Sequence, residues 1–287
     1  MRYWLLAIRP KTLSLSIAPV LTGTSLAWAE HHLLTWQPAL AALSAALLIQ
    51  IATNLHNDAV DFERGADTAD RLGPERATAQ GWLSAKEVKY AAYGCFGLVF
   101  LIGIYLAAVG GWPIIVIGLL SLLAGYSYTG GPRPIAYSSS GELFVFLFFG
   151  LAAVTGSYYI QALSLSLNAF LSACAIGSLA TAVLLVNNYR DLDTDIQANK
   201  LTLVSHLGRC GSQRLYMLLL IAPFALPFTL QHLSNGTLLA LATLPLALWL
   251  LRRFNSEQPG PGFNLLLAAT AQLQLLFALL LSAGLVL

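Results

Sequence analysis

Two acidic segments have residue types and spacing suited to binding a hard metal ion. They cover residues 57–71 and 187–195, and each begins with an Asn that is followed by several Asp residues. Oxygen ligands without His or Cys favour Mg²⁺, which typically takes one or two carboxylates, several waters and the phosphate oxygens of a substrate. Residues four apart share one face of a helix. Asn57 with Asp61, and Asp191 with Asp195, are therefore candidate ligands for Mg²⁺ or a similar ion bound together with a diphosphate.

Both segments continue an apolar stretch with no Gly or Pro at the junction, so helical geometry can extend into them. Carboxylates repel one another at this spacing, and the C-terminal end of a helix disfavours anions. Two such helix ends in one chain indicate that a cation offsets the cost. The alternative is a pair of solvated helix ends balanced by nearby Arg. Asp58 and Asp67 are candidate supports for the metal or diphosphate, although Asp58 is expected to point away from the shared face.

Basic residues near the acidic segments suit a polyanionic leaving group. Arg71, Arg133 and Lys200 are the candidates for binding the diphosphate, because they lie in loops that could reach it. Arg9 fits either a site residue or an ordinary loop charge. Arg76 is expected to be an ordinary loop charge, as are Arg64, Lys86, Arg252 and Arg253.

Three tyrosines near the ends of apolar stretches are candidates for stabilising a cation or for lining an acceptor pocket. An aromatic ring attracts a cation to its face, and these residues are Tyr128, Tyr137 and Tyr189. Tyrosine also gathers at membrane interfaces without any catalytic role. Both interpretations remain open from the residues alone.

The elements that would position these residues follow from the spacing of charge. Only 10% of the 287 residues are charged, against about 25% in soluble domains. This composition excludes a soluble enzyme, a nucleic-acid-binding protein and a disulfide-rich secreted domain. Charge is absent from six stretches: 12–29, 31–57, 90–132, 143–189, 215–251 and 258–287.

A membrane-spanning helix needs about 20 apolar residues. The first two stretches and the last therefore hold one span each. The other three hold two each, with breaks near residues 110–113, 164–168 and 232–236. The sequence thus predicts an all-α polytopic membrane protein, a single domain over 1–287 with nine transmembrane helices.

With nine spans, all 15 basic residues fall in loops on one side of the membrane. The positive-inside rule makes that side cytoplasmic, with the N-terminus inside and the C-terminus outside. Both acidic segments then lie at cytoplasmic helix ends. An ion-coupled secondary transporter would instead place such carboxylates near the bilayer midplane on broken helices. This position favours an enzyme.

Several motifs resemble those of the UbiA-type intramembrane prenyltransferases. In chain order these motifs are Arg9-Pro10-Lys11-Thr12, Asn57-Asp58-x-x-Asp61 with Asp70-Arg71-Leu72-Gly73-Pro74, Tyr128-Thr129-Gly130-Gly131-Pro132-Arg133-Pro134, Asn187-Asn188-Tyr189-Arg190-Asp191-x-x-x-Asp195 and Lys200. The first acidic motif, within 57–74, is similar to its naphthoate-prenylating form, and the second lies within 187–203. Ser138-Ser139-Ser140 and Asn199 depart from the family pattern.

The resemblance implies a helical bundle in which the two acidic motifs face each other. It also implies Mg²⁺-dependent transfer of a polyprenyl group from polyprenyl diphosphate to 1,4-dihydroxy-2-naphthoate. Two Mg²⁺ ions would bind the diphosphate, held by Asn57, Asp61, Asp191 and Asp195. Carbon dioxide is lost from the attacked ring carbon, giving demethylmenaquinone. The location implied is the inner membrane of a bacterium, with the prenyl tail among apolar helices open to membrane lipid. The alternative is another aromatic acceptor on the same scaffold, of the 4-hydroxybenzoate or homogentisate type.

Overall fold

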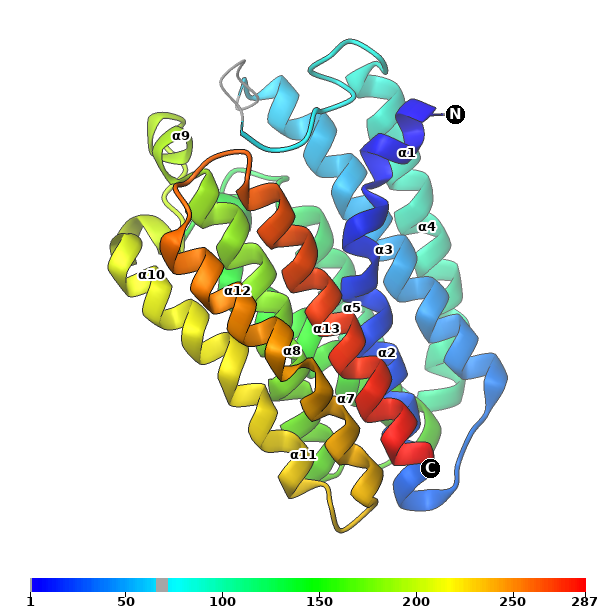
Figure 1. The fold of residues 1–287 in the computed structure, drawn as a ribbon. Helices are drawn as coiled ribbons and strands as arrows, with labels where there is room; N and C mark the ends of the chain where they lie inside the picture. Colours follow the sequence, from blue (N-terminus) through cyan, green and yellow to red (C-terminus); the bar gives the residue numbers. More distant parts are fainter. Residues whose placement is uncertain (1, 66–71) are drawn as a thin grey trace.

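The computed structural model describes residues 2–65 and 72–287, which form a bundle of helices with no strand in those ranges. The two chain termini lie at opposite ends of the bundle (Figure 1). The α-helices are α1 (Arg2–Ile8), α2 (Pro10–His31), α3 (Trp36–Glu63), α4 (Ala85–Gly110), α5 (Trp112–Ser127), α6 (Gly141–Val145), α7 (Ala153–Ala162), α8 (Leu167–Arg190), α9 (Leu192–Gln197), α10 (Leu203–Ile221), α11 (Leu226–Thr229), α12 (Leu244–Ser256) and α13 (Phe263–Val286). A π-helical segment, Phe146–Ala152, joins α6 to α7, and 3₁₀ turns occupy Ile135–Tyr137, Ala222–Ala225 and Asn235–Thr243.

Seven helical segments in the described residues are long and apolar enough to cross a membrane, which confirms a polytopic membrane protein. A shorter apolar helix, α5, has 16 residues. α10 has 19 residues and carries Arg209 and Arg214. The predicted breaks also coincide with helix ends: α4 ends at Gly110, α7 at Ala162 and α11 at Thr229.

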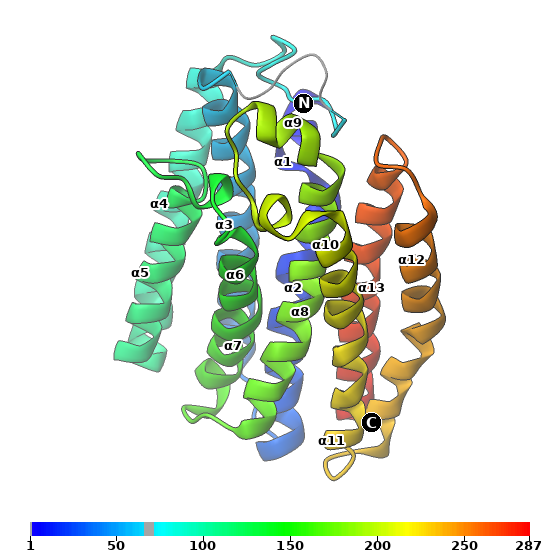
Figure 2. The same cartoon turned by 90° about the vertical axis from the view of Figure 1, so that its left-hand side faces the viewer.

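Small residues let the central helices approach closely. α2 packs against α7 and α13, and α8 packs against the π-helical segment (Figure 2). A Cβ added to Gly150 would lie 2.6 Å from the Ala173 carbonyl oxygen and 2.7 Å from Gly177 Cα. Inside a membrane the hydrophobic effect does not drive helices together. Close backbone approach of this kind is a common way for them to pack there. It fixes the position of the π-helical segment, and hence of the aromatic residues that the segment carries.

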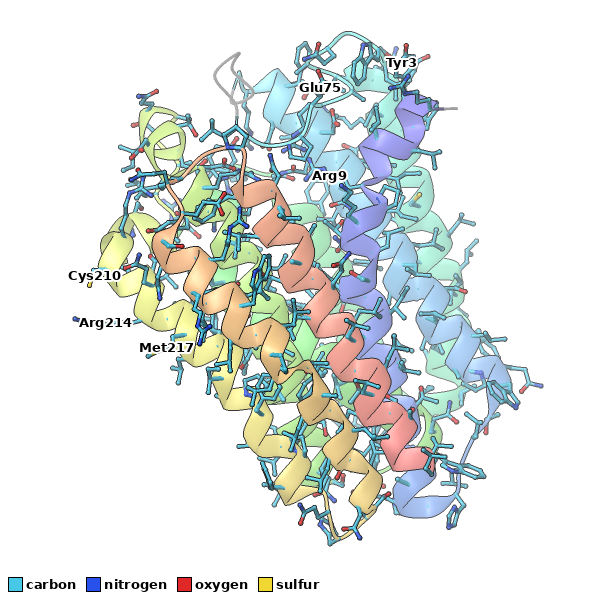
Figure 3. All side chains as sticks on the ribbon, in the orientation of Figure 1. Tyr3, Arg9, Glu75, Cys210, Arg214 and Met217 are labelled. Atoms are coloured by element: carbon cyan, nitrogen blue, oxygen red, sulfur yellow. The ribbon has the colours of Figure 1, made fainter. Side chains whose placement is uncertain are left out.

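We call one end of the bundle the head end. It consists of α1, α9 and the loops over residues 72–84 and 128–140. α1 and α9 lie at the same end as the N-terminus (Figures 1 and 2). Tyr3, Arg9 and Glu75 are also found there (Figure 3). The chain turns between α1 and α2 at Arg9, whose φ is 56°. This turn directs the Arg9 side chain toward the end of α3, where it meets Asn57.

Candidate active site

The structure brings the two acidic segments to the walls of one cavity at the head end. Asn57 and Asp61 lie in the last two turns of α3, whereas Asp191 and Asp195 lie where α8 passes into α9. All four side chains line a single cavity of about 860 Å³. The four residues predicted to act together therefore line the same cavity. Their role as metal ligands stays a prediction.

Basic and phenolic groups already engage the first acidic segment. Arg9 Nη2 donates to Asn57 Oδ1 at 3.1 Å. Arg76 Nη2 donates to Asp61 Oδ2 at 3.0 Å, and the Tyr137 hydroxyl donates to Asp61 Oδ1 at 3.0 Å. Arg76 and Asp61 are both buried. Removing one partner of a buried ion pair leaves an uncompensated charge, so each residue depends on the other.

The second acidic segment is held by a buried arginine. Arg190 Nε and Nη2 donate to the two oxygens of Asp191 at 2.7 and 2.6 Å. The same guanidinium donates to Asn187 Oδ1 at 2.9 Å and to Asn264 Oδ1 at 2.7 Å. Asn264 in turn donates to the Leu72 carbonyl oxygen at 3.1 Å. This network ties the end of α8 to α13 and to the loop after α3.

Lys200 and Tyr137 connect the two sides of the cavity. Lys200 Nζ donates to Asp195 Oδ1 at 3.2 Å and lies 5.9 Å from the centre of the Tyr137 ring. The guanidinium of Arg64 lies 5.4 Å from the same ring centre. Both cations are within the range of attraction to an aromatic face. Tyr137 and Lys200 line the cavity as predicted candidates.

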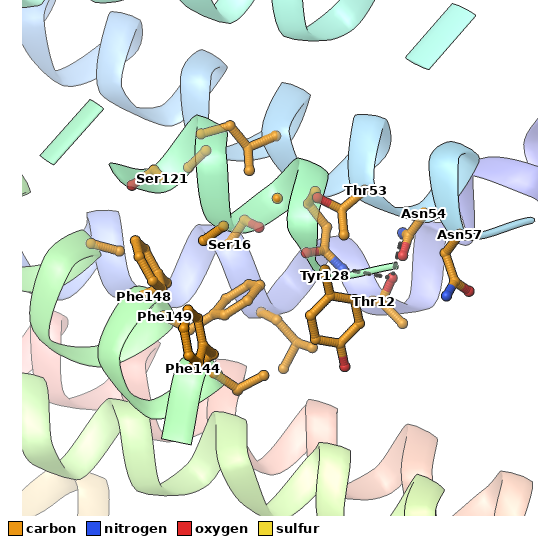
Figure 4. Close-up of a pocket in the computed structure, with 18 of the residues that line it drawn as sticks. Thr12, Ser16, Thr53, Asn54, Asn57, Ser121, Tyr128, Phe144, Phe148 and Phe149 are labelled. Atoms are coloured by element: carbon orange, nitrogen blue, oxygen red, sulfur yellow. Dashed lines mark hydrogen bonds between the residues drawn. The ribbon is translucent and has the colours of Figure 1, made fainter. Parts of the chain in front are cut away.

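Tyr128, at the end of α5, is another predicted residue that lines the cavity. Burial raises the pKa of its hydroxyl above the usual range, and the charges of Glu142 and Asp61 raise it further. The hydroxyl therefore stays protonated and can donate a hydrogen bond. In Figure 4 it lies on the same side of the cavity as Thr12, Asn54 and Asn57.

Three predicted site residues do not line this cavity. Tyr189 is buried, and its ring packs 4.5 Å from Phe254 and 5.4 Å from Phe263, measured between ring centres. Arg133 is exposed on the loop that follows α5. Asp58 accepts hydrogen bonds from the backbone N–H groups of residues 77 and 78 and from the Thr78 hydroxyl, so it fastens the loop before α4.

Two other predicted residues, Asp67 and Arg71, lie outside the described residues. The expectation for Arg76 was wrong. It is buried against Asp61 and lines the cavity instead of serving as an ordinary loop charge. Nothing in its own sequence neighbourhood signals this contact, because it depends on how the loop folds back over α3. Arg9, which the sequence left open, also lines the cavity.

Below its charged mouth most of the cavity lining is apolar. Phe144, Phe148 and Phe149 line one wall, and the rings of the first two stack with their centres 5.9 Å apart (Figure 4). Phe149 and Phe148 belong to the π-helical segment, a type of distortion that often occurs at functional sites. On the other side, Ile104 of α4 and Ile115 of α5 line the cavity and are also exposed on the surface of the bundle.

This cavity, charged at one end, mostly apolar elsewhere and built within membrane-spanning helices, suits a ligand with an anionic head and a hydrocarbon tail. The cavity volume lies within the range of small-molecule sites, about 300–1,000 Å³.

Comparison with known proteins identifies the class of protein. The UbiA prenyltransferase family matches residues 16–262. The chain is 36% identical to 1,4-dihydroxy-2-naphthoate octaprenyltransferase of Mycobacterium tuberculosis, over 98% of this chain and 96% of that protein. It is 41% identical to the Escherichia coli protein of the same name, over 76% of this chain and 72% of that protein. The fold is similar to a UbiA homolog from Archaeoglobus fulgidus bound to GPP and Mg²⁺, with a TM-score of 0.73 and 17% identity over 99% of both chains. The chain belongs to the UbiA prenyltransferase family.

Proposed function

We propose that this protein transfers a polyprenyl group from polyprenyl diphosphate to 1,4-dihydroxy-2-naphthoate, with loss of carbon dioxide. The observation that carries the proposal is the single cavity: both acidic segments line its mouth and an apolar tunnel lies below. The names of the relatives from Mycobacterium tuberculosis and Escherichia coli support the acceptor. The alternative acceptors, 4-hydroxybenzoate and homogentisate, are outcomes of the test below.

The side chains at the mouth fit Mg²⁺ that arrives with a diphosphate. In the described residues, no group of three His, Cys, Asp or Glu side chains is arranged to hold a metal by itself. Mg²⁺ typically binds only one or two carboxylates and completes its coordination shell with water and phosphate oxygens, so it does not need such a group. We assign Asn57, Asp61, Asp191 and Asp195 to two such ions. When bound, Mg²⁺ would neutralise the charge that develops on the departing diphosphate.

The protein's own cations complete the diphosphate site. Arg9, Arg76 and Lys200 line the cavity, and each contacts one of the proposed ligands. They can donate to phosphate oxygens while the carboxylates turn to the metal. We also propose that Arg71, in the loop after α3, binds the diphosphate, and that Asp67 in the same loop supports the metal or the diphosphate. Arg64 and Lys200 already lie beside the face of the Tyr137 ring, and this position suits a ring that stabilises positive charge.

We further propose nine membrane spans with the head end in the cytoplasm, the N-terminus inside and the C-terminus outside. The seven long apolar helical segments, together with α5 and α10, would make up the nine spans. The opposite positions of the two termini in Figure 1 support an odd number of spans. We place the protein in the bacterial inner membrane, with the tunnel open to lipid along α4 and α5.

The test is transfer by the purified protein in lipid nanodiscs, with geranyl diphosphate as donor. We expect prenylated naphthoquinol and equimolar carbon dioxide from 1,4-dihydroxy-2-naphthoate, and loss of both products after EDTA, with recovery on adding Mg²⁺. Faster transfer to 4-hydroxybenzoate or homogentisate would reassign the acceptor. Full activity in EDTA would remove the metal from the proposal.

A further inference from the structure

A hydrogen-bond network below the acidic ends fixes the orientation of two carboxamides in the cavity wall. The Thr12 hydroxyl donates its only hydrogen to the Arg9 carbonyl oxygen at 2.9 Å, so toward other groups Thr12 Oγ1 can only accept. Gln50 Nε2 donates to it at 3.3 Å and Asn54 Nδ2 at 3.0 Å. Asn54 Nδ2 also donates to the Ile8 carbonyl oxygen at 2.9 Å. Both amide nitrogens therefore face the start of α2. Figure 4 shows this for Asn54 and Thr12.

The two amide oxygens consequently face the cavity. Gln50 and Asn54 are 8% and 6% exposed, and both line the cavity. Within the described ranges, the hydrogen bonds of these side chains use only their nitrogens, and neither oxygen is among the buried polar atoms that lack a partner, so both oxygens border open space. The space that each oxygen faces is thus the interior of the cavity. Two acceptor oxygens with no protein donor on a cavity wall suit a ligand that brings hydroxyl hydrogens.

The position of the pair relative to the acidic ends suits the second substrate. Gln50 and Asn54 are four residues apart on α3, so their side chains start about 5–6 Å apart on one helix face. That separation is comparable with the distance between para oxygens on a six-membered ring. Asn57 lies three residues above Asn54, a rise of about 4.5 Å along a helix. A ring bound at this pair would lie directly beneath the proposed diphosphate site.

We infer that Gln50 and Asn54 form the acceptor subsite, where their amide oxygens accept hydrogen bonds from the phenolic hydroxyls of an aromatic diol. Thr12 is a positioning residue, because it holds both amides in the required orientation. The inference rests on the proposed function and deepens it by naming the groups that recognise the acceptor. A ring that carries only carbonyl oxygens offers these groups no hydrogen, so the subsite favours the reduced diol over a quinone.

The experiment compares two competing ligands that differ by one hydroxyl. Geranyl transfer to 1,4-dihydroxy-2-naphthoate is inhibited with either 4-hydroxy-2-naphthoate or 2-naphthoate, and the ratio of the two inhibition constants reports the hydroxyl contact. We expect the hydroxylated ligand to bind the wild type about tenfold more tightly. The ratio should fall toward one in Gln50→Met or in Asn54→Leu, whichever removes the amide that faces the 4-hydroxyl, and in Thr12→Val, which releases both amides. The KM for geranyl diphosphate should stay unchanged.

Gln161→Met is the matched control. Gln161 is also a buried glutamine, but it bonds Thr35 at the opposite end of the bundle and does not line the cavity. It should keep the wild-type ratio. A ratio near one in the wild type, or a wild-type ratio in all three cavity variants, would overturn the subsite. Absence of any transfer to the naphthoate by the wild type would instead overturn the proposed function.

Discussion

At the scale of single residues, the site consists of carboxylates that are neutralised by arginine or lysine. Asp61 pairs with Arg76, Asp191 with Arg190, and Asp195 with Lys200. Isolated carboxylates in so buried a position would carry a large desolvation cost. The ion pairs offset part of this cost before substrate binds. Arg76 and Lys200 also line the cavity, where a diphosphate can meet them, so these two residues serve both the structure and the proposed reaction.

Replacing either central carboxylate should abolish transfer. Asp61→Asn and Asp191→Asn keep the side-chain size but remove the charge that would hold the metal. Even outer partners of metal ligands typically cost 10–100-fold in affinity or activity, so we expect at least about 100-fold loss in kcat/KM for geranyl diphosphate. Steady-state assays in nanodiscs at saturating Mg²⁺ measure it.

Asp193→Asn is the control for that prediction. Asp193 lies in the same segment, but it is exposed and pairs with Arg209 at 2.9 Å. Its replacement should leave the rate within about twofold, because exposed ion pairs contribute little. Equal losses in Asp193→Asn and Asp191→Asn would show that negative charge in the segment matters rather than its placement.

At the scale of elements, the π-helical segment depends on two glycines. Gly150 and Gly177 allow the segment and α8 to touch through their backbones. A side chain at Gly150 would meet backbone atoms, which cannot rotate aside. The aromatic wall of the tunnel therefore depends on residues that do not line it.

Gly150→Val should destabilise the bundle by about 1–3 kcal/mol, the usual cost of overpacking. Thermal unfolding in detergent, followed by circular dichroism, would show it as a lowered Tm. Gly97→Val is the matched control, since a Cβ at Gly97 meets no atom within 4 Å and the residue is exposed on α4. An unchanged Tm for Gly150→Val would contradict the close packing of these elements.

The elements were more predictable from sequence than the contacts between them. Charge-free stretches and their breaks locate the apolar helices, because the membrane constrains composition along the whole length of a span. The four-residue spacing of Asn57 with Asp61 indicates a shared helix face for a local reason, helical geometry.

Contacts made by loop folding left no such signal. The burial of Arg76 against Asp61 depends on the path of the loop after α3, and Tyr189 faces Phe254 instead of the cavity because of how α8 is rotated. In the sequence, Asn199 is a departure from the family pattern without an evident reason. The structure gives it a φ of 55°, a left-handed conformation that Asn tolerates better than most residues other than Gly.

At the scale of the whole molecule, charge and termini define a direction across the membrane. Glu75 is exposed at the head end, and Ser164 is exposed between α7 and α8. In a variant without the three native cysteines, Glu75→Cys should react with a membrane-impermeant maleimide only in inverted vesicles. Ser164→Cys should react only in right-side-out vesicles. Labelling of both cysteines from one side would contradict the proposed topology.

The tunnel extends the site from the mouth into the depth of the bundle, and its free space should limit the length of the donor. Gly103 of α4 and Gly118 of α5 line the cavity, and a Cβ added at either meets no atom within 4 Å. A large side chain there would occupy the space of the hydrocarbon tail without displacing the helices. Gly118→Phe should therefore keep transfer from geranyl diphosphate and lose at least about tenfold in kcat/KM with an octaprenyl donor, a loss on the scale of binding energy from a few buried methylenes. Gly94→Phe, on the exposed face of α4 and away from the cavity, should leave the ratio between the two donors unchanged. If Gly118→Phe slows both donors equally, the tail does not pass this position, and the tunnel's apolar depth serves packing rather than substrate binding.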